Sequence, residues 1–201
     1  MKADLRVYLQ GARDVMAWKL DGLSEYDARR PLVPTGTNLL GMVKHLAKWE
    51  FRYFGDCFGR SSGETPPWCY ADEKPGTDMW ATAEESRELI IGWYRRAWAH
   101  ADATLDALDL DAVGQVPWWG ANGTVTLGRI LVHMTADTQR HAGHADIVRE
   151  LIDGAVGFLP GQDNAEPADE GEQLAYRNQV EQAAQTAYAR TRPPRLQYGN
   201  R

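Results

Sequence analysis

The sequence contains few cysteines: Cys57 and Cys69 are the only two among 201 residues. Their spacing matches no cysteine-based zinc motif, and no third cysteine is present to complete one. We therefore expect both residues to be free thiols, as is usual in a cytosolic protein.

The sequence also lacks a basic cluster and a long apolar run. It has 22 Lys and Arg against 28 Asp and Glu, for a net charge of −6, and the basic residues are scattered. This pattern argues against nucleic acid or an anionic membrane as a partner. No apolar run approaches the roughly 20 residues that span a bilayer, and residues 1–16 lack the apolar core of a signal peptide. We therefore expect a cytoplasmic protein.

Helical periodicity dominates the chain. Hydrophobic residues make up 43% of it, enough for a substantial core, and they recur at three- and four-residue spacing. No internal repeat and no convincing strand ladder is evident. Helices are expected at residues 4–23, 37–59, 82–108, 124–153 and, near the C-terminus, up to about 190. The sequence predicts an all-α protein, a four-helix bundle with an additional C-terminal helix.

The chain divides by composition into two parts. Residues 1–155 carry the four periodic segments and are expected to form the bundle. Residues 156–201 hold a polar link rich in Asp, Glu and Pro, followed by a helical tail that packs on or beside the bundle. The last residues, 192–201, are expected to be frayed.

Local signals mark several helix ends. Thr35 or Thr37 is the expected N-cap of the second helix, and Thr124 or Thr126 that of the fourth. The third helix is expected to start near residue 82, where T-A-E-E resembles a capping box. Gly154 is a natural C-cap for the fourth helix.

Eight tryptophans are a high number for this length. Four of them fall in predicted loops, where a plain helical bundle does not need them. Aromatic side chains in long loops often wall a pocket, so we expect a ligand site near these loops. The four loop residues are Trp68, Trp80, Trp118 and Trp119.

The segment 133–148, HMTADTQRHAGHADIV, places polar residues where a helix needs apolar ones. Asp137 and His141 fall on the apolar stripe, four residues apart, so they project from successive turns of the same face. A buried carboxylate is costly unless it is paired or binds a metal. Two interpretations stay open: a metal site, or an ion pair of Asp137 with Arg140 or another cation beside a core histidine. The stripe comprises Leu127, Ile130, Leu131, Met134, Thr138, Ala145, Val148 and Ile152.

His45 is the best candidate for a third ligand, although it lies off the centre of the apolar stripe of its own helix. Ligands from facing helices are common in four-helix bundles. Two imidazoles and one carboxylate leave an open position, as in catalytic zinc sites; nickel or iron(II) also fits. His133 and His144 are rival ligands on the 133–148 helix, and His144 is alternatively a substrate-facing group.

Two further polar residues receive ordinary structural interpretations. His100 is expected to be an exposed side chain. Glu50 lies on the apolar line of its helix, and we expect it to form an ion pair within the bundle.

Two segments resemble the DinB-like superfamily of metal-binding helical bundles: TNLLGMVKHLAKWEFRYFGDCFG and VTLGRILVHMTADTQRHAGHADIVRELIDG. They are most similar to the actinobacterial branch of mycothiol-dependent S-transferases and maleylpyruvate isomerase, over roughly residues 5–155. The resemblance implies that His45, Asp137 and His141 bind the metal at one end of the bundle. Many relatives have His at the position of Asp137, and the mycothiol branch has the longer Glu.

The resemblance also implies a chemistry: transfer of a low-molecular-weight thiol, such as mycothiol, to an electrophilic small molecule. A cation that binds the thiol lowers its pKa, and the sequence offers no nucleophile–base pair of its own. Arg52 and Arg140 are expected to bind carboxylates of the thiol or substrate, and His144 to take part in catalysis. The alternative is a non-catalytic metal- or small-ligand-binding, stress-related protein. A homodimer is compatible with either.

Overall fold

The computed structural model describes residues 1–70, 76–162 and 169–191. The chain forms two compact units, residues 1–162 and 163–201. In the second unit, α6 (Glu170–Thr191) confirms the predicted C-terminal helix. Part of the predicted polar link, residues 163–168, and the predicted frayed end, residues 192–201, lie outside the described residues. Packing of the tail on the bundle stays a prediction.

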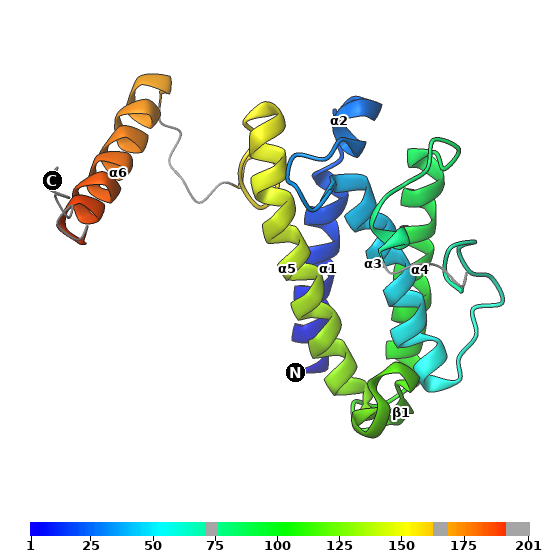
Figure 1. The fold of residues 1–201 in the computed structure, drawn as a ribbon. Helices are drawn as coiled ribbons and strands as arrows, with labels where there is room; N and C mark the ends of the chain where they lie inside the picture. The colour runs from blue at the N-terminus through cyan, green and yellow to red at the C-terminus, as the bar shows by residue number, and fades with distance from the viewer. Residues whose placement is uncertain (71–75, 163–168, 192–201) are drawn as a thin grey trace, which may run out of the picture. The chain divides into compact units, whose positions relative to one another are not determined.

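Four long helices build the first unit and confirm the predicted all-α bundle (Figure 1). Arg6, near the start of α1, pairs with Asp106 at the end of α4, so these two helices are antiparallel. Lys19, directly after α1, pairs with Asp146 near the end of α5, so α1 and α5 run in the same direction. The helices are α1 (Lys2–Trp18), α3 (Leu39–Phe54), α4 (Arg87–Ala107) and α5 (Leu127–Asp153).

The apolar periodicity of each helix explains why the four pack together. The side chains that recur at three and four residues are buried, and burying each one stabilises the fold by about 1.5–3 kcal/mol. On α5, seven of the eight predicted stripe residues are buried, and Ile152 is partly buried. The apolar pattern therefore fixes which face of α5 meets α1 and α3.

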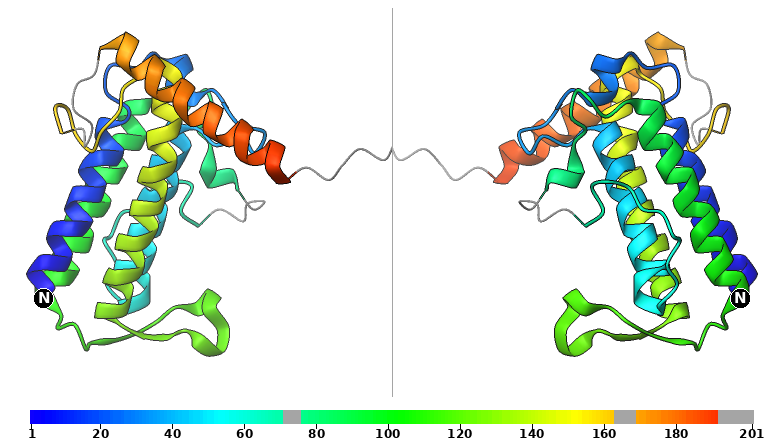
Figure 2. Two further views of the ribbon diagram at one scale, coloured as in Figure 1. Left: turned by 90° about the vertical axis from the view of Figure 1, so that its left-hand side faces the viewer. Right: turned by 90° about the vertical axis from the view of Figure 1, so that its right-hand side faces the viewer.

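Short elements fill the connections between the long helices. No strand ladder was evident in the sequence, but one short pair forms: β1 and β2 are antiparallel, with Gly114 opposite Val125. Figure 2 shows this hairpin at the end of the bundle where α4 ends and α5 begins. The short elements are α2 (Glu25–Arg29), η1 (Asp56–Phe58), η2 (Thr77–Met79), β1 (Val113–Gln115), η3 (Pro117–Asn122) and β2 (Thr124–Thr126).

The ends of α5 confirm the sequence prediction. Thr126 is its N-cap, and the Thr126 hydroxyl accepts a hydrogen bond from the backbone N–H of Arg129 at 3.2 Å. Gly154 follows the last turn with φ of 76°, a left-handed conformation that glycine adopts without steric strain. The candidate ligands therefore lie near the middle of a helix whose limits are locally encoded.

The starts of α3 and α4 differ from the prediction. The N-cap of α3 is Asn38, not a threonine, and its side-chain oxygen accepts from the backbone N–H of Gly41 at 2.8 Å. The N-cap of α4 is Ser86. The backbone N–H of Thr82 does bond to Glu85 Oε2 at 2.8 Å, but this bond closes a turn that precedes the helix.

A buried ion pair joins α1 to α3 and confirms the expectation for Glu50. Arg13 Nη2 lies 2.7 Å from Glu50 Oε2, and Arg13 Nε donates to Oε1 at 3.0 Å. Both side chains are at most 1% exposed. Burial raises the pKa of Glu50, and the charge of Arg13 opposes that shift.

Within the part of the chain that the structure describes, no helix has both the length and the apolar character needed to cross a membrane. Both cysteines are free thiols, as predicted, and both are buried. Burial raises the pKa of Cys57 to about 12 and that of Cys69 to about 11, so neither thiol is a nucleophile near neutral pH.

Candidate metal centre

The structure brings His45, Asp137 and His141 together between α3 and α5. One nitrogen or oxygen atom from each lies within 4.8 Å of those of the other two. The ring centroids of His45 and His141 are 5.0 Å apart. Residues 137 and 141 are one turn apart on α5, and α3 supplies the third donor from the facing helix.

The cluster lies near the middle of both helices, so the expectation of a site at one end of the bundle was wrong. It also lies at the edge of the apolar stripe, not at its centre. The side chains of His45, Asp137 and His141 are 18%, 30% and 12% exposed. All three side chains are therefore partly, but not fully, withdrawn from solvent.

The contacts between the three side chains fit a divalent metal. His141 Nε2 is 3.8 Å from Asp137 Oδ1, which is too long for a hydrogen bond. His141 Nδ1 is buried and finds no hydrogen-bond partner among the described residues. Two imidazoles and one carboxylate that converge without bonding directly are a donor set suited to zinc, iron(II) or nickel.

His141 is neutral at physiological pH. Burial, reinforced by the neighbouring His45, lowers its pKa from 6.5 to about 4. A neutral imidazole is the form that binds metal, because a protonated ring has no free lone pair. Binding of a metal near pH 7 would therefore not have to displace a proton from a charged His141 ring.

His45 is oriented by Asp78, a residue that the sequence did not suggest. His45 Nδ1 and Asp78 Oδ2 are 2.8 Å apart, and the Asp78 side chain is only 11% exposed. Trp49 Nε1 also donates to Asp78 Oδ2, at 3.2 Å. A proton on His45 Nδ1, donated to this carboxylate, leaves Nε2 free to bind a metal.

An aromatic cluster adjoins the donors. Trp49 contacts His45 with ring centroids 5.9 Å apart, and Trp118 follows at 5.4 Å from Trp49. Trp118 Nε1 donates to the hydroxyl of Tyr53 at 3.2 Å. His133 packs against Tyr53 at 4.9 Å and is not part of the donor cluster, so the geometry disfavours it as a ligand.

The predicted loop tryptophans separate into two groups. Trp118 and Trp119, both in η3, pack against Tyr53 beside the donors. Trp68 is 3% exposed in the apolar core, and Trp80 is 51% exposed. Of the loop tryptophans expected near a ligand site, Trp118 and Trp119 therefore lie beside the donors, whereas the indole of Trp68 is buried in the core.

The remaining site candidates lie at different distances from the donors. The guanidinium of Arg52 lies 4.2 Å from the centroid of Trp118, so it borders the aromatic cluster. His144 is exposed, with its ring centroid 5.9 Å from that of His141. Arg140 is exposed and, among the described residues, makes no ion pair with Asp137. The structure therefore does not form the Asp137–Arg140 ion pair that was one alternative to a metal site.

His100 differs from its expected exposure. It is partly buried, and its ring stacks on Phe51 at 5.7 Å. His100 lies on the side of α4 that packs against α3. The spacing of residues along α4 alone does not show which side this is.

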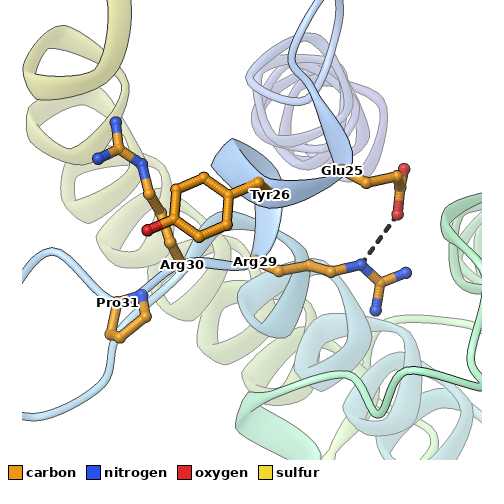
Figure 3. A pocket seen from close by; sticks show the side chains of 5 residues that line it. All are labelled: Glu25, Tyr26, Arg29, Arg30 and Pro31. Carbon is orange, nitrogen blue, oxygen red and sulfur yellow. Dashed lines mark hydrogen bonds and ion pairs between the residues drawn. The ribbon is translucent and has the colours of Figure 1, made fainter.

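A separate shallow pocket lies at α2, and its arginines are already engaged. The Arg29 Nε–Glu25 Oε2 distance is 2.9 Å, and the other two nitrogens of Arg29 donate to the carbonyls of Thr82 and Glu85. These bonds fasten α2 to the segment before α4 and occupy all three nitrogens of Arg29, and Arg30 Nε lies 2.9 Å from Asp27 Oδ1. Figure 3 shows the lining residues: Glu25, Tyr26, Arg29, Arg30 and Pro31.

The fold and the site define a four-helix bundle that presents two histidines and an aspartate from facing helices to one point. A family model for mycothiol S-transferases matches residues 4–154, three quarters of the chain. The chain belongs to this family, as its resemblance to the DinB-like superfamily implied. A search of curated proteins found no match.

The buried histidines predict how stability depends on pH. Burial lowers the pKa of His100, His133 and His141 below the ordinary 6.5. The unfolded chain then binds more protons than the folded one between about pH 6.5 and 4, so stability falls as the pH falls through this window. We expect metal-free protein to melt at a lower temperature at about pH 5 than at pH 7, measured by calorimetry with chelator present. His100→Gln should reduce the difference; an equal Tm at both pH values contradicts the assignment.

Proposed function

We propose that this protein transfers a low-molecular-weight thiol, mycothiol or a close analogue, to an electrophilic small molecule. The observation that supports it most directly is the convergence of His45, Asp137 and His141, with donor atoms within 4.8 Å of one another, in a chain of the mycothiol S-transferase family. These three residues would hold a divalent cation, with zinc preferred and nickel or iron(II) as alternatives.

The bound cation would supply a lowered thiol pKa, and hence a thiolate near neutral pH. The chain's own residues provide the surroundings of that chemistry. Asp137 brings the negative charge that favours a cation over a neutral ligand, and it reaches the cluster although it is one methylene shorter than Glu. Asp78 holds the ring of His45 through Nδ1.

The aromatic cluster and Arg52 would receive the organic parts of the two substrates. Trp49 offers an apolar face next to His45, and Trp118 extends this surface away from the donors. Arg52, over the Trp118 ring, can bind a carboxylate at the edge of the same surface. Arg140, exposed on α5, is a second candidate for such a carboxylate.

His144 is proposed to carry the proton that the reaction releases. As the thiol sulfur forms a bond to the electrophilic carbon, the thiol proton must reach the leaving group or solvent. His144 is exposed and lies one turn from His141, so it connects the site to solvent without being a ligand.

The proposal predicts that conjugation depends on both metal and thiol. Purified protein loaded with zinc, nickel or iron(II) is incubated with mycothiol, bacillithiol or glutathione and the electrophile monochlorobimane, and conjugate fluorescence is followed. We expect faster conjugation with mycothiol than in a metal-stripped control. Asp137→Asn, which keeps the volume and removes the charge, should reduce bound metal and rate together.

Two results would contradict the proposal in different ways. Protein that holds metal at the cluster but conjugates no thiol to any of several electrophiles is a binding protein, not a transferase. Turnover that is unchanged after complete metal removal would show that His45, Asp137 and His141 serve another purpose.

A further inference from the structure

We propose that Asp78 is a positioning residue that sets the affinity of the site for its cation, through His45. The proposal rests on the metal-binding role of His45 proposed above. Asp78 belongs to η2, within the long connection between α3 and α4, and contacts the site from outside both ligand-bearing helices.

The carboxylate of Asp78 receives two hydrogen bonds from α3. Its Oδ2 atom lies 2.8 Å from His45 Nδ1 and 3.2 Å from Trp49 Nε1. Trp49 Nε1 also lies 3.1 Å from His45 Nδ1. Indole nitrogen is only a donor, so when Nδ1 carries the proton that is bonded to Asp78, the indole N–H donates to the carboxylate oxygen. The bond to Nδ1 selects the imidazole tautomer that has its lone pair on Nε2 and restricts rotation of the ring.

The segment that carries Asp78 is itself fastened to α3. Lys44, only 3% exposed, donates from Nζ to the carbonyl of Trp80 at 3.0 Å and lies 2.8 Å from Glu85 Oε2. Asn38, the N-cap of α3, donates from Nδ2 to the carbonyl of Met79 at 3.2 Å. Bonds to residues on the C-terminal side of Asp78 thus hold the carboxylate in place independently of any cation.

Gly41 permits this close approach. A Cβ atom at position 41 would lie 1.8 Å from the carbonyl oxygen of Met79, a backbone atom that cannot move without displacing η2. The absence of a side chain at Gly41 therefore lets the backbone next to Asp78 rest directly on the first turns of α3. The same helix presents His45 one turn later.

These contacts together prepare the imidazole before a ligand arrives. A histidine that is free to rotate must be ordered when metal binds, whereas His45 is already held by a fixed carboxylate. A carboxylate that is hydrogen-bonded to a metal-binding histidine typically raises metal affinity 10- to 100-fold. Asp78 should therefore act on the dissociation constant of the cation without touching the cation.

The test is metal affinity in Asp78→Asn, a variant of nearly unchanged shape. Metal-free full-length protein is titrated with Zn²⁺ against a competing chromophoric chelator. We expect the variant to bind zinc about 10- to 100-fold more weakly than the original chain. The matched control is Asp102→Asn, which removes a carboxylate paired with Arg13, away from His45, and should leave zinc affinity unchanged.

A second variant displaces Asp78 without altering it. Gly41→Ala should push the Met79 backbone away and weaken zinc binding, although alanine is the better helix former. A readout free of metal accompanies both variants: ¹⁵N NMR of the His45 side chain in metal-free protein. The Nδ1–H tautomer should predominate in the original chain and lose its predominance in Asp78→Asn and Gly41→Ala.

The outcomes separate the two proposals. If the original chain binds zinc and Asp78→Asn binds it equally well, with an unchanged His45 tautomer, the role of Asp78 is wrong and the metal function stands. If the original chain binds none of zinc, nickel or iron(II), the metal function fails and the inference about Asp78 fails with it.

Discussion

Replacing His141 with alanine is expected to reduce bound divalent cation to background and to lower thiol conjugation by roughly a thousandfold or more. The substitution removes one of the three candidate donors, and a metal ion typically contributes several kcal/mol to transition-state stabilisation. The ring also packs against His45, so its loss leaves that histidine without its neighbour across the helix interface. Native mass spectrometry of the variant measures the bound metal. The initial rate of conjugation with mycothiol measures the loss of activity.

His144→Ala is the matched control for this variant. It removes an imidazole from the same helix, one turn away, whose side chain is exposed and does not belong to the donor cluster. We expect it to retain bound metal and to lose rate only to the extent that His144 carries a proton. Retention of metal and rate in His141→Ala, or loss of metal in His144→Ala, would mean that the ligand has been assigned to the wrong turn of α5.

The sequence allowed α5 and its two candidate ligands to be predicted because the relevant signals are local. Thr126 bonds to a backbone N–H three residues away, and Gly154 terminates the helix by its own conformation. Asp137 and His141 share a face by helical spacing alone. His45 lies on another helix, and it was found because a metal needs a further ligand and because the family resemblance supplied one.

Other parts of the site depend on contacts that no local pattern encodes. Asp78 reaches His45 across 33 residues, and only the docking of η2 on Gly41 and Asn38 brings it there. The hairpin that frames the tryptophans of η3 has strands of three residues, too short for alternation to be recognised.

The largest stability effect is expected at the ion pair between Arg13 and Glu50. Each single replacement, Arg13→Met or Glu50→Met, leaves a buried charge without its main partner and should cost about 3–5 kcal/mol of unfolding free energy, measured by urea denaturation. The double variant should recover most of that loss, because two apolar side chains of similar length fill the space without a desolvation penalty. Asp102, the second partner of Arg13, is 37% exposed and is then solvated by water. If the unfolding free energy of each single variant lies within about 1 kcal/mol of that of the original chain, the pair is not isolated from solvent. If the double variant folds and the single variants do not, the two charges stabilise this bundle only as a pair.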